Sequence, residues 1–422
     1  MPLSRHFYSL DEVQAALLYT TSRYNPSESL FWCQEMLLSG CVGEAISTLF
    51  QSWLWNTGPT RLQWLIEAWK TLASDELSED DILLNTYRLA TIHHSQRDTS
   101  LWNILVLTSQ NPDEMPDTIT RKSPTVYPSS DEKELYFIRA IFQGKAQSAW
   151  WITQFIDTDR VWTLLYWYTE NIHTKYKDQY TICLEALKGY EKLLGYQTPE
   201  YDAMVRACAV FMMCLDPNTQ EQSFKPLLNE IDKSNAQTLN ELDVAVGRRE
   251  RRVYSIPSAC LYGTTQRGCS KWSQHNFTQL YNVEKYLIGC PFWDEVLAEY
   301  AEVSDEGDIK WLNDDKLEEF YEKYFPDDIP DEWSKKDQLK SHGDGVLGPK
   351  DKPTMAKYSR SFLCKTPHLA WNTTREVNKY LEQLNINDCS VERVIQLGKQ
   401  PRPGLSPEDI KNLLPVHKIK IV

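Results

Sequence analysis

One pattern recurs from residue 9 to about residue 235: a helix-capping residue, apolar residues three or four positions apart, and then a glycine or polar turn. Ser9 precedes Leu-Asp-Glu, an N-cap followed by acids in the first turn. Pro26 begins the segment PSESLFWCQEMLLSG, and Gly40 is placed to end it. Apolar residues at this spacing form one face of an α-helix, which must pack against another element. We therefore predict a mainly α fold, either a helical bundle or a helical-repeat-like body, with an irregular C-terminal region.

The same criteria predict further helices over residues 44–55, 59–72, 79–93, 131–142, 159–172, 176–194 and 200–215. Superposing Gly40 on Gly144 aligns LFWCQEMLLSGCVGEA with ELYFIRAIFQGKAQSA, so that Ala45 falls over Ala149. The alignment predicts two similar helix pairs that meet tightly at a glycine turn. The two copies are further apart than the roughly 20–50 residues of a solenoid period, so a true repeat family stays open.

A chain of 422 residues is too long for one compact core, which favours two or three domains or one extended helical array. Pro, Ser and Asp are concentrated in residues 110–130, where a loop between two helical blocks is predicted. The predicted organisation is an N-terminal helical block (1–110), a second helical block (131–245), a mixed region with basic and then acidic segments (246–334), a linker (335–373) and a small C-terminal helical segment (374–422).

Ten of the fifteen tryptophans lie within the first 170 residues. They are Trp32, Trp53, Trp55, Trp64, Trp69, Trp102, Trp150, Trp151, Trp162 and Trp167. Most are predicted to be core residues, since each indole buries a large area and needs one hydrogen-bond partner. The adjacent rings of Trp150 and Trp151 cannot lie on one face of a helix, so at least one helix must be apolar on two sides.

Composition argues for a folded protein outside the membrane, with 41% hydrophobic and 25% charged residues. No apolar run approaches the roughly 20 residues that span a bilayer, and the start of the chain lacks the apolar core of a signal peptide. The ten scattered cysteines are expected to be reduced and packed as small hydrophobic residues. We predict a cytoplasmic or nuclear protein that needs no cofactor; its oligomeric state stays open.

The charge changes sign abruptly in the second half of the chain. Residues 248–271 contain six basic residues and one acid, whereas residues 294–332 contain sixteen acids and three lysines. Blocks of opposite sign either satisfy each other in the fold or are presented to partners. This pattern therefore indicates association with other molecules.

The basic block is the best nucleic-acid-binding candidate, because cations that neutralise phosphates lie near rings that could stack on bases. Its residues are Arg248, Arg249, Arg251, Arg252, Arg267, Lys271 and Trp272. A solvated face, an intramolecular partner for the acidic block, or a nuclear import signal would explain the same charges.

The acidic block contains aromatic residues that could dock into a partner's groove while the acids suppress wrong partners. The candidate partner-binding residues are Phe320, Tyr321, Tyr324, Phe325 and Trp333. A packed peripheral helix would explain the same residues equally well.

No phosphate-binding loop, dinucleotide fingerprint, zinc-protease, nucleophile-elbow or kinase motif occurs in the chain. An enzyme with dispersed catalytic residues stays possible, and no catalytic residue is predicted. Cys260, Cys269, His275 and Cys290 have the chemistry of zinc ligands. Their spacing is wrong for a knuckle or ribbon, which pairs ligands two to four residues apart, so no metal site is predicted.

The segments SIPSACLYGTTQRG and FYEKYFPDDIPDEWSKKDQLKSHG, with the N-terminal helices, resemble uncharacterised proteins of nucleocytoplasmic large DNA viruses. The resemblance covers no motif of known chemistry and implies no functional residue. It implies a location in the host-cell cytoplasm or the virion.

Together these features favour a non-enzymatic helical scaffold or protein-interaction protein that binds other proteins and no membrane. The alternative is a nucleic-acid-binding accessory protein that uses the basic segment at residues 248–272.

Overall fold

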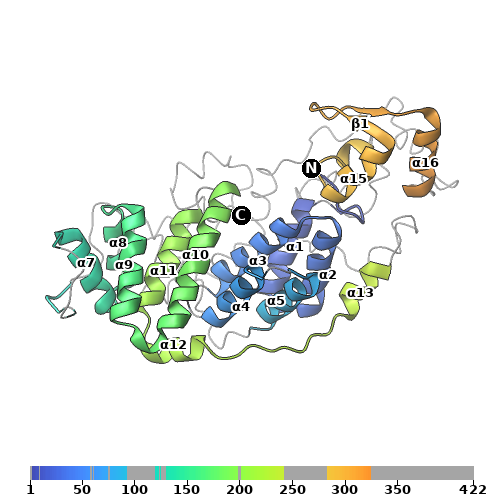
Figure 1. Cartoon of the computed structure of the whole chain (residues 1–422). Helices are drawn as coiled ribbons and strands as arrows, with labels where there is room; N and C mark the ends of the chain where they lie inside the picture. The colour runs from blue at the N-terminus through green and yellow to red at the C-terminus, as the bar shows by residue number, and fades with distance from the viewer. Residues whose placement is uncertain are drawn as a thin grey trace, which may run out of the picture. The chain divides into compact units, whose positions relative to one another are not determined.

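The computed structural model describes residues 2–8, 10–57, 59, 61–74, 77–92, 119–122, 124, 130–197, 201–241 and 283–324. Within these residues, 70% are helical, and the strands form one two-stranded sheet (Figure 1). The predicted mainly α fold is confirmed. Ser9, the predicted first N-cap, lies outside the described residues.

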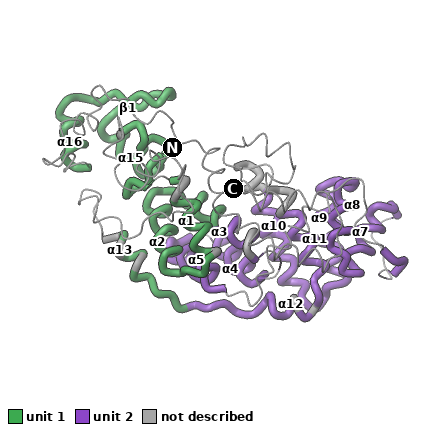
Figure 2. Tube along the Cα trace, turned by 180° about the vertical axis from the view of Figure 1, so that it is seen from behind, with its two compact units in different colours: residues 1–48, 230–365 green, residues 49–229, 366–422 purple. Residues whose placement is uncertain are grey.

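The chain divides into two compact units (Figure 2). Unit 1 comprises residues 1–48 and 230–365, and unit 2 comprises residues 49–229 and 366–422. This grouping differs from the contiguous blocks predicted from the sequence, because the chain after residue 230 returns to the first 48 residues. Contacts between segments so distant in sequence do not affect local hydrophobic periodicity, so this periodicity cannot predict them.

Unit 1 is built from seven helical segments and a short hairpin, as far as the structure describes it. Its elements are α1 (Leu10–Ser22), α2 (Pro26–Leu38), the start of α3 (Val42–Asn56), α13 (Ser234–Glu241), the 3₁₀ turn η4 (Val283–Tyr286), α15 (Pro291–Tyr300), β1 (Ala301–Val303), β2 (Ile309–Trp311) and α16 (Asp314–Tyr324). Helix α2 contacts both α1 and α13, and nine consecutive residues of α2 are buried, which places this helix at the centre of the unit.

Unit 2 is a set of helices arranged around α10. Its elements are the end of α3, α4 (Leu62–Leu72), α5 (Glu79–Thr91), α7 (Glu132–Phe142), α8 (Ala146–Thr153), α9 (Thr158–Asn171), the 3₁₀ turn η2 (Thr174–Tyr176), α10 (Lys177–Gln197), α11 (Tyr201–Cys214) and α12 (Pro217–Ser223). Helix α10 contacts α4, α9 and α11. The helices predicted from capping and periodicity are confirmed, and their ends differ by a few residues.

Aromatic rings fill the interior of unit 2. The ring of Tyr190 on α10 stacks on that of Phe50, with ring centroids 3.7 Å apart, and also contacts Trp69. Gly189 lies directly against the Trp69 indole, where no Cβ would fit. The indole of Trp162 donates to the Oε2 atom of Glu191 at 3.0 Å, so α9 is joined to α10 by a half-buried polar contact.

The expectation that most of the tryptophans are core residues is confirmed for Trp32, Trp53, Trp64, Trp150 and Trp162, which are all buried. The side chains of Trp69, Trp151 and Trp167 are half-buried. The side chain of Trp55 and the whole of Trp102 lie outside the described residues.

The two aligned glycines end their helices in the same way. Gly40 follows α2 with φ +77°, and its N–H donates to the Leu37 carbonyl while the Cys41 N–H donates to Met36. Gly144 follows α7 with φ +67°, and the N–H groups of residues 144 and 145 donate to residues 141 and 140. Both patterns are Schellman motifs, in which a residue of positive φ satisfies the last carbonyls of a helix. The predicted glycine turns are therefore confirmed.

Alanine substitutions at these two glycines form a matched pair. Gly144→Ala is expected to cost about 1 kcal/mol, because a side chain disfavours positive φ and the nearest atom to the new Cβ lies 3.4 Å away. Gly40→Ala is expected to cost at least about twice as much, since its Cβ would lie 2.7 Å from that of Pro291. Urea unfolding of both variants checks the order, and equal losses would contradict this packing of Gly40.

The hairpin between α15 and α16 was not predicted from the sequence. Strands β1 and β2 are antiparallel, and Ala301 pairs with Trp311. Gly307, with φ +80°, closes the turn. The strands have three residues each, too few for alternating hydrophobicity to be recognised. Before α15, the described residues 283–289 form only the 3₁₀ turn η4.

Candidate partner-binding surface

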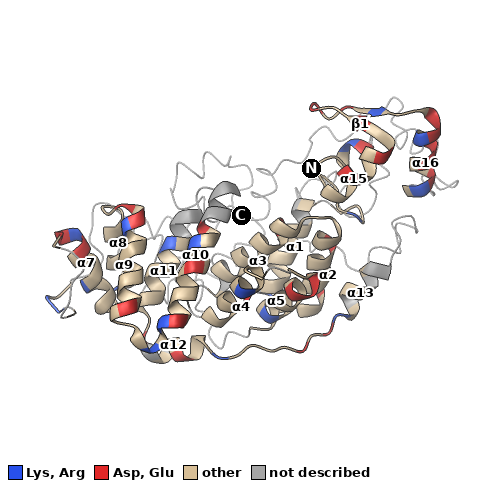
Figure 3. Ribbon diagram, viewed as in Figure 1, with Lys and Arg blue, Asp and Glu red and all other residues tan. Residues whose placement is uncertain are grey.

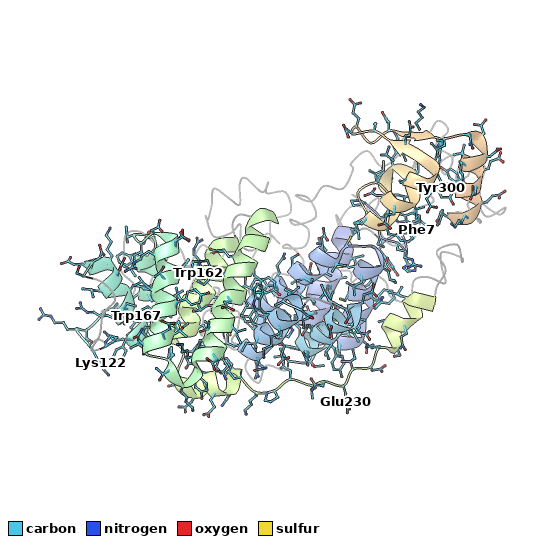
Figure 4. All side chains as sticks on the ribbon, viewed as in Figure 1. Phe7, Lys122, Trp162, Trp167, Glu230 and Tyr300 are labelled. Carbon is cyan, nitrogen blue, oxygen red and sulfur yellow. The ribbon has the colours of Figure 1, made fainter. Side chains whose placement is uncertain are left out.

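The N-terminal segment (residues 2–8) connects α15 to the rest of unit 1 through hydrogen bonds and ring contacts. The Leu3 N–H donates to the Tyr286 carbonyl at 2.7 Å, and the Trp293 indole donates to the Ser4 carbonyl at 2.9 Å. The rings of Phe7 and Trp293 lie 5.1 Å apart, and Figure 4 shows Phe7 beside the base of α15. Phe7 has a positive φ of 64°, a strained conformation for a non-glycine residue, and its side chain is buried.

A fully buried pair joins this segment to α2. The Nδ1 atom of His6 lies 2.6 Å from the Oε2 atom of Glu35, and both side chains are 0% exposed. The backbone N–H of His6 donates to Oε1 of the same carboxylate at 3.0 Å. A buried carboxyl group requires such partners, because its oxygens would otherwise be left without hydrogen bonds away from water. The Nε2 atom of His6 has no hydrogen-bond partner within the described part of the chain.

An aromatic core holds α15, the hairpin and α16 together. Phe320 is fully buried between Tyr300 and Trp311, with ring centroids 5.5 and 5.0 Å away. Tyr324 is 7% exposed and contacts Trp293 at 5.4 Å. These two rings therefore belong to the core.

This packing changes the partner-binding prediction. Phe320 and Tyr324 are not available to a partner in this conformation, because they lie four residues apart on the face of α16 that the core covers. Tyr321 is half-buried and donates to the Oε2 atom of Glu284 at 3.0 Å. Phe325 and Trp333 lie outside the described residues. The side of α16 that a partner can reach is acidic.

All twelve acids between positions 294 and 322 are exposed. We call this set the acidic surface, and Figure 3 shows it in red on α15, the hairpin and α16. It consists of Asp294, Glu295, Glu299, Glu302, Asp305, Glu306, Asp308, Asp314, Asp315, Glu318, Glu319 and Glu322. Residues 283–324 contain thirteen acids and four lysines, which gives this region a net charge of −9.

The lysines of this region neutralise few of the acids. Lys285 pairs with Asp308 at 3.0 Å, Lys310 with Glu302 at 3.8 Å, and Lys316 with Glu319 at 2.6 Å. The ammonium groups of Lys316 and Lys323 lie 5.0 and 4.9 Å from the ring centres of Tyr300 and Tyr324, respectively. Exposed pairs of this kind are screened and weak. The acidic surface therefore keeps a large excess of negative charge.

Two apolar side chains are exposed on the hairpin among these acids. Val303 is 39% exposed at the end of β1, and Leu312 is 53% exposed directly after β2. Single exposed apolar residues are common on protein surfaces. On the hairpin, Val303 and Leu312 are placed to make short-range apolar contacts with a molecule that the acidic charge attracts from a longer distance.

Unit 2 has a separate aromatic cluster at α7 and α8, formed by Tyr136, Trp151 and Phe155. The rings of Trp151 and Phe155 are 5.3 Å apart, and those of Tyr136 and Trp151 are 6.2 Å apart. Phe155 is 46% exposed, whereas the neighbouring Trp150 is buried. The expectation that Trp150 and Trp151 point to different sides is confirmed.

The predicted nucleic-acid-binding residues, Arg248 to Trp272, lie outside the described residues, as do Cys260, Cys269 and His275. Cys290 is buried at the N-terminal end of α15. In the part of the chain that the structure describes, no three His, Cys, Asp or Glu side chains are grouped as metal ligands.

Six cysteines are described, and five of them are buried, which confirms the expectation that they pack as small hydrophobic residues. None of the described helices is both long enough and apolar enough to cross a bilayer. No family model, curated protein or solved structure matches this chain.

Proposed function

We propose that this protein is a non-enzymatic scaffold that binds a basic segment of another protein through its acidic surface. The observation that carries the proposal is the set of twelve exposed acids on one structured module, of which the described lysines pair with only three. The electrostatic field of a negatively charged surface speeds its encounter with basic partners and disfavours the binding of acidic ones.

The packing of the module supports this proposal. The buried rings of Trp293, Tyr300 and Phe320 hold α15, the hairpin and α16 together. Charges fixed on such a core lose little conformational freedom on binding. The aromatic cluster on α7 and α8 offers unit 2 a second, more apolar contact surface, which suits a protein that joins two partners.

Neutralising acids tests the proposal. The variant Glu295→Gln, Asp305→Asn, Glu306→Gln, Glu318→Gln and Glu322→Gln removes five negative charges from positions without an ion pair among the described residues. Its matched control, Glu79→Gln, Glu132→Gln, Asp159→Asn, Asp178→Asn and Glu185→Gln, removes five exposed acids from unit 2 that likewise have no ion pair among the described residues.

We expect tagged wild-type protein and the control to capture the same basic proteins from the native cells after nuclease treatment. The variant lacking acids on the acidic surface is expected to retain less than about a tenth of that material, because several charge contacts are lost together. Capture should also decline as salt is raised from about 50 to 300 mM. Equal capture by all three proteins would contradict the proposal.

Nucleic-acid binding through the basic segment is the alternative function. It is supported by the six cations at positions 248–271. Reversing Arg248, Arg249, Arg251 and Arg252 to glutamate is then expected to abolish binding to a labelled duplex of random sequence and to remove its salt dependence. Unchanged affinity would contradict this alternative, as would partners that all survive nuclease treatment.

The resemblance to proteins of large DNA viruses stays a prediction, and with it a location in the host-cell cytoplasm or the virion. A cytoplasmic or nuclear location is likewise part of the proposal. Imaging the tagged protein in its native cells tests both locations.

A further inference from the structure

Two thiols from distant parts of the chain meet beneath the surface of unit 1. The sulfur atoms of Cys41 and Cys290 both contact the carbonyl oxygen of Ser39, at 3.7 and 3.5 Å. Both sulfur atoms therefore lie against the same backbone oxygen. Ser39 and Cys290 are 251 positions apart in the sequence, so this meeting depends on the tertiary fold.

The backbones that carry these thiols are also in contact. The N–H of Phe292 donates to the Ser39 carbonyl at 3.2 Å, and a Cβ on Gly40 would lie 2.7 Å from that of Pro291. Gly40 directly precedes Cys41, and Pro291 directly follows Cys290. A disulfide requires Cα atoms about 4.4–6.8 Å apart, and closely packed backbones allow this without a large rearrangement.

The two cysteines have different environments. Cys290 is the N-cap residue of α15. A hydrogen bond from the Cys41 thiol lowers the pKa of Cys290; burial opposes this, and the N–H groups of Trp293 and Phe292 lower it further. The pKa of Cys41 is raised, first by the same hydrogen bond and then by burial. Because Cys290 lies at the N-terminus of α15, where the helix dipole favours a thiolate, we expect it to be the nucleophile of the pair.

We infer that Cys41 and Cys290 are a redox-active thiol pair that hydrogen peroxide converts into an intramolecular disulfide. The pair lies close to the protein surface. The two cysteines are buried, but their direct neighbours in the sequence, Gly40 and Pro291, are both exposed. A small oxidant needs only a local opening at this point to reach the sulfur atoms. This inference goes beyond the proposed binding function and does not depend on it.

The reaction proceeds in two steps. The Cys290 thiolate attacks one oxygen of hydrogen peroxide, the O–O bond breaks, and the released hydroxide takes up the proton lost by the thiol to give water. The Cys41 sulfur then attacks the sulfur of the Cys290 sulfenic acid. The S–S bond forms, the S–O bond breaks, and the hydroxyl leaves with the Cys41 proton as a second water. The two thiols lose two electrons, which reduce the peroxide.

The disulfide would link the turn after α2 covalently to the start of α15. It would therefore join the module that carries the acidic surface to the N-terminal part of unit 1. A cross-link that closes a loop of this length restricts the unfolded chain strongly. The oxidised protein is therefore expected to unfold at a temperature about 5 °C or more above that of the reduced protein.

The test exposes the purified full chain to hydrogen peroxide, blocks free thiols with iodoacetamide and maps disulfides by mass spectrometry without reduction. We expect a linked peptide pair containing Cys41 and Cys290, formed at least about tenfold faster than any oxidation of Cys183 or Cys208. Burial raises the pKa of both of those thiols, so they serve as internal controls.

Variants identify the role of each sulfur. In Cys41→Ser, dimedone should trap a sulfenic acid on Cys290, whereas in Cys290→Ser the Cys41 thiol should stay reduced. Cys208→Ser is the matched control and should form the disulfide at the wild-type rate. Wild-type protein that shows no Cys41–Cys290 peptide, or that links Cys183 to Cys208 equally fast, would overturn the inference without any variant.

Discussion

Replacing Glu35 with alanine is expected to destabilise unit 1 by about 3–5 kcal/mol. One oxygen of its carboxyl group lies 2.6 Å from the Nδ1 atom of His6, the other accepts from the His6 backbone N–H, and neither side chain is exposed to water. Removing one partner of a buried pair leaves the other without compensation, which is far more destabilising than losing an exposed pair. The urea midpoint of the variant should therefore fall well below that of the wild type.

The control is Glu295→Ala, which removes an exposed glutamate from α15 in the same unit. It is expected to change stability by less than about 0.5 kcal/mol. The double variant His6→Ala with Glu35→Ala should lose less than the sum of the two single variants, because the two groups interact directly. Additive losses in that cycle would show that the pair contributes no coupling energy.

Trp293→Ala is the second substitution with a large expected effect, a loss of about 3–5 kcal/mol. The indole is fully buried, contacts the rings of Phe7 and Tyr324, and donates to the Ser4 carbonyl. Its removal leaves a cavity and an unsatisfied carbonyl. Hydrogen exchange should therefore accelerate in residues 2–8 and in α15 and α16 before it accelerates in unit 2.

Trp151→Ala is the matched control, because Trp151 is half-buried in the aromatic cluster of unit 2. A loss of no more than about 1–2 kcal/mol is expected there, in proportion to the smaller area it buries. If the two variants lost equal stability, or if exchange in residues 2–8 were unchanged in Trp293→Ala, the packing of the N-terminal segment on α15 would be contradicted.

The helices were predictable from the sequence because their causes are local. Asn25 and Ser78 cap α2 and α5 through their side chains, and Gly40 and Gly144 end helices with positive φ. Such features act within one turn of the chain, where capping residues and apolar spacing are visible in the sequence.

Phe320 and Tyr324 were predicted to bind a partner because acids surround them in the sequence, with a packed helix as the alternative; the structure places both rings in the core. The spacing of Phe320 and Tyr324, one helical turn apart, already indicates a single covered face. This spacing was the available signal, and it separates the core rings from the acids on the other faces of the helix.

The assembly of unit 1 was not predictable in the same way. Contacts of Ser4 with Trp293 and of Ser39 with Cys290 join residues more than 250 positions apart. The partners in these contacts, a backbone carbonyl with an indole or thiol, carry no pattern in the sequence. The acidic charge itself was visible from composition, whereas its placement on a packed module required the fold.

Binding through the acidic surface is best tested by carbodiimide cross-linking of the complex isolated from native cells, because this reagent joins carboxylates to lysine amines that are in contact. We expect peptides carrying Glu295, Glu318 and Glu322 to be coupled to lysines of another protein, and the acid-neutralised variant to lose these links. Coupling of these acids only to lysines of the same chain, such as Lys271, would contradict it.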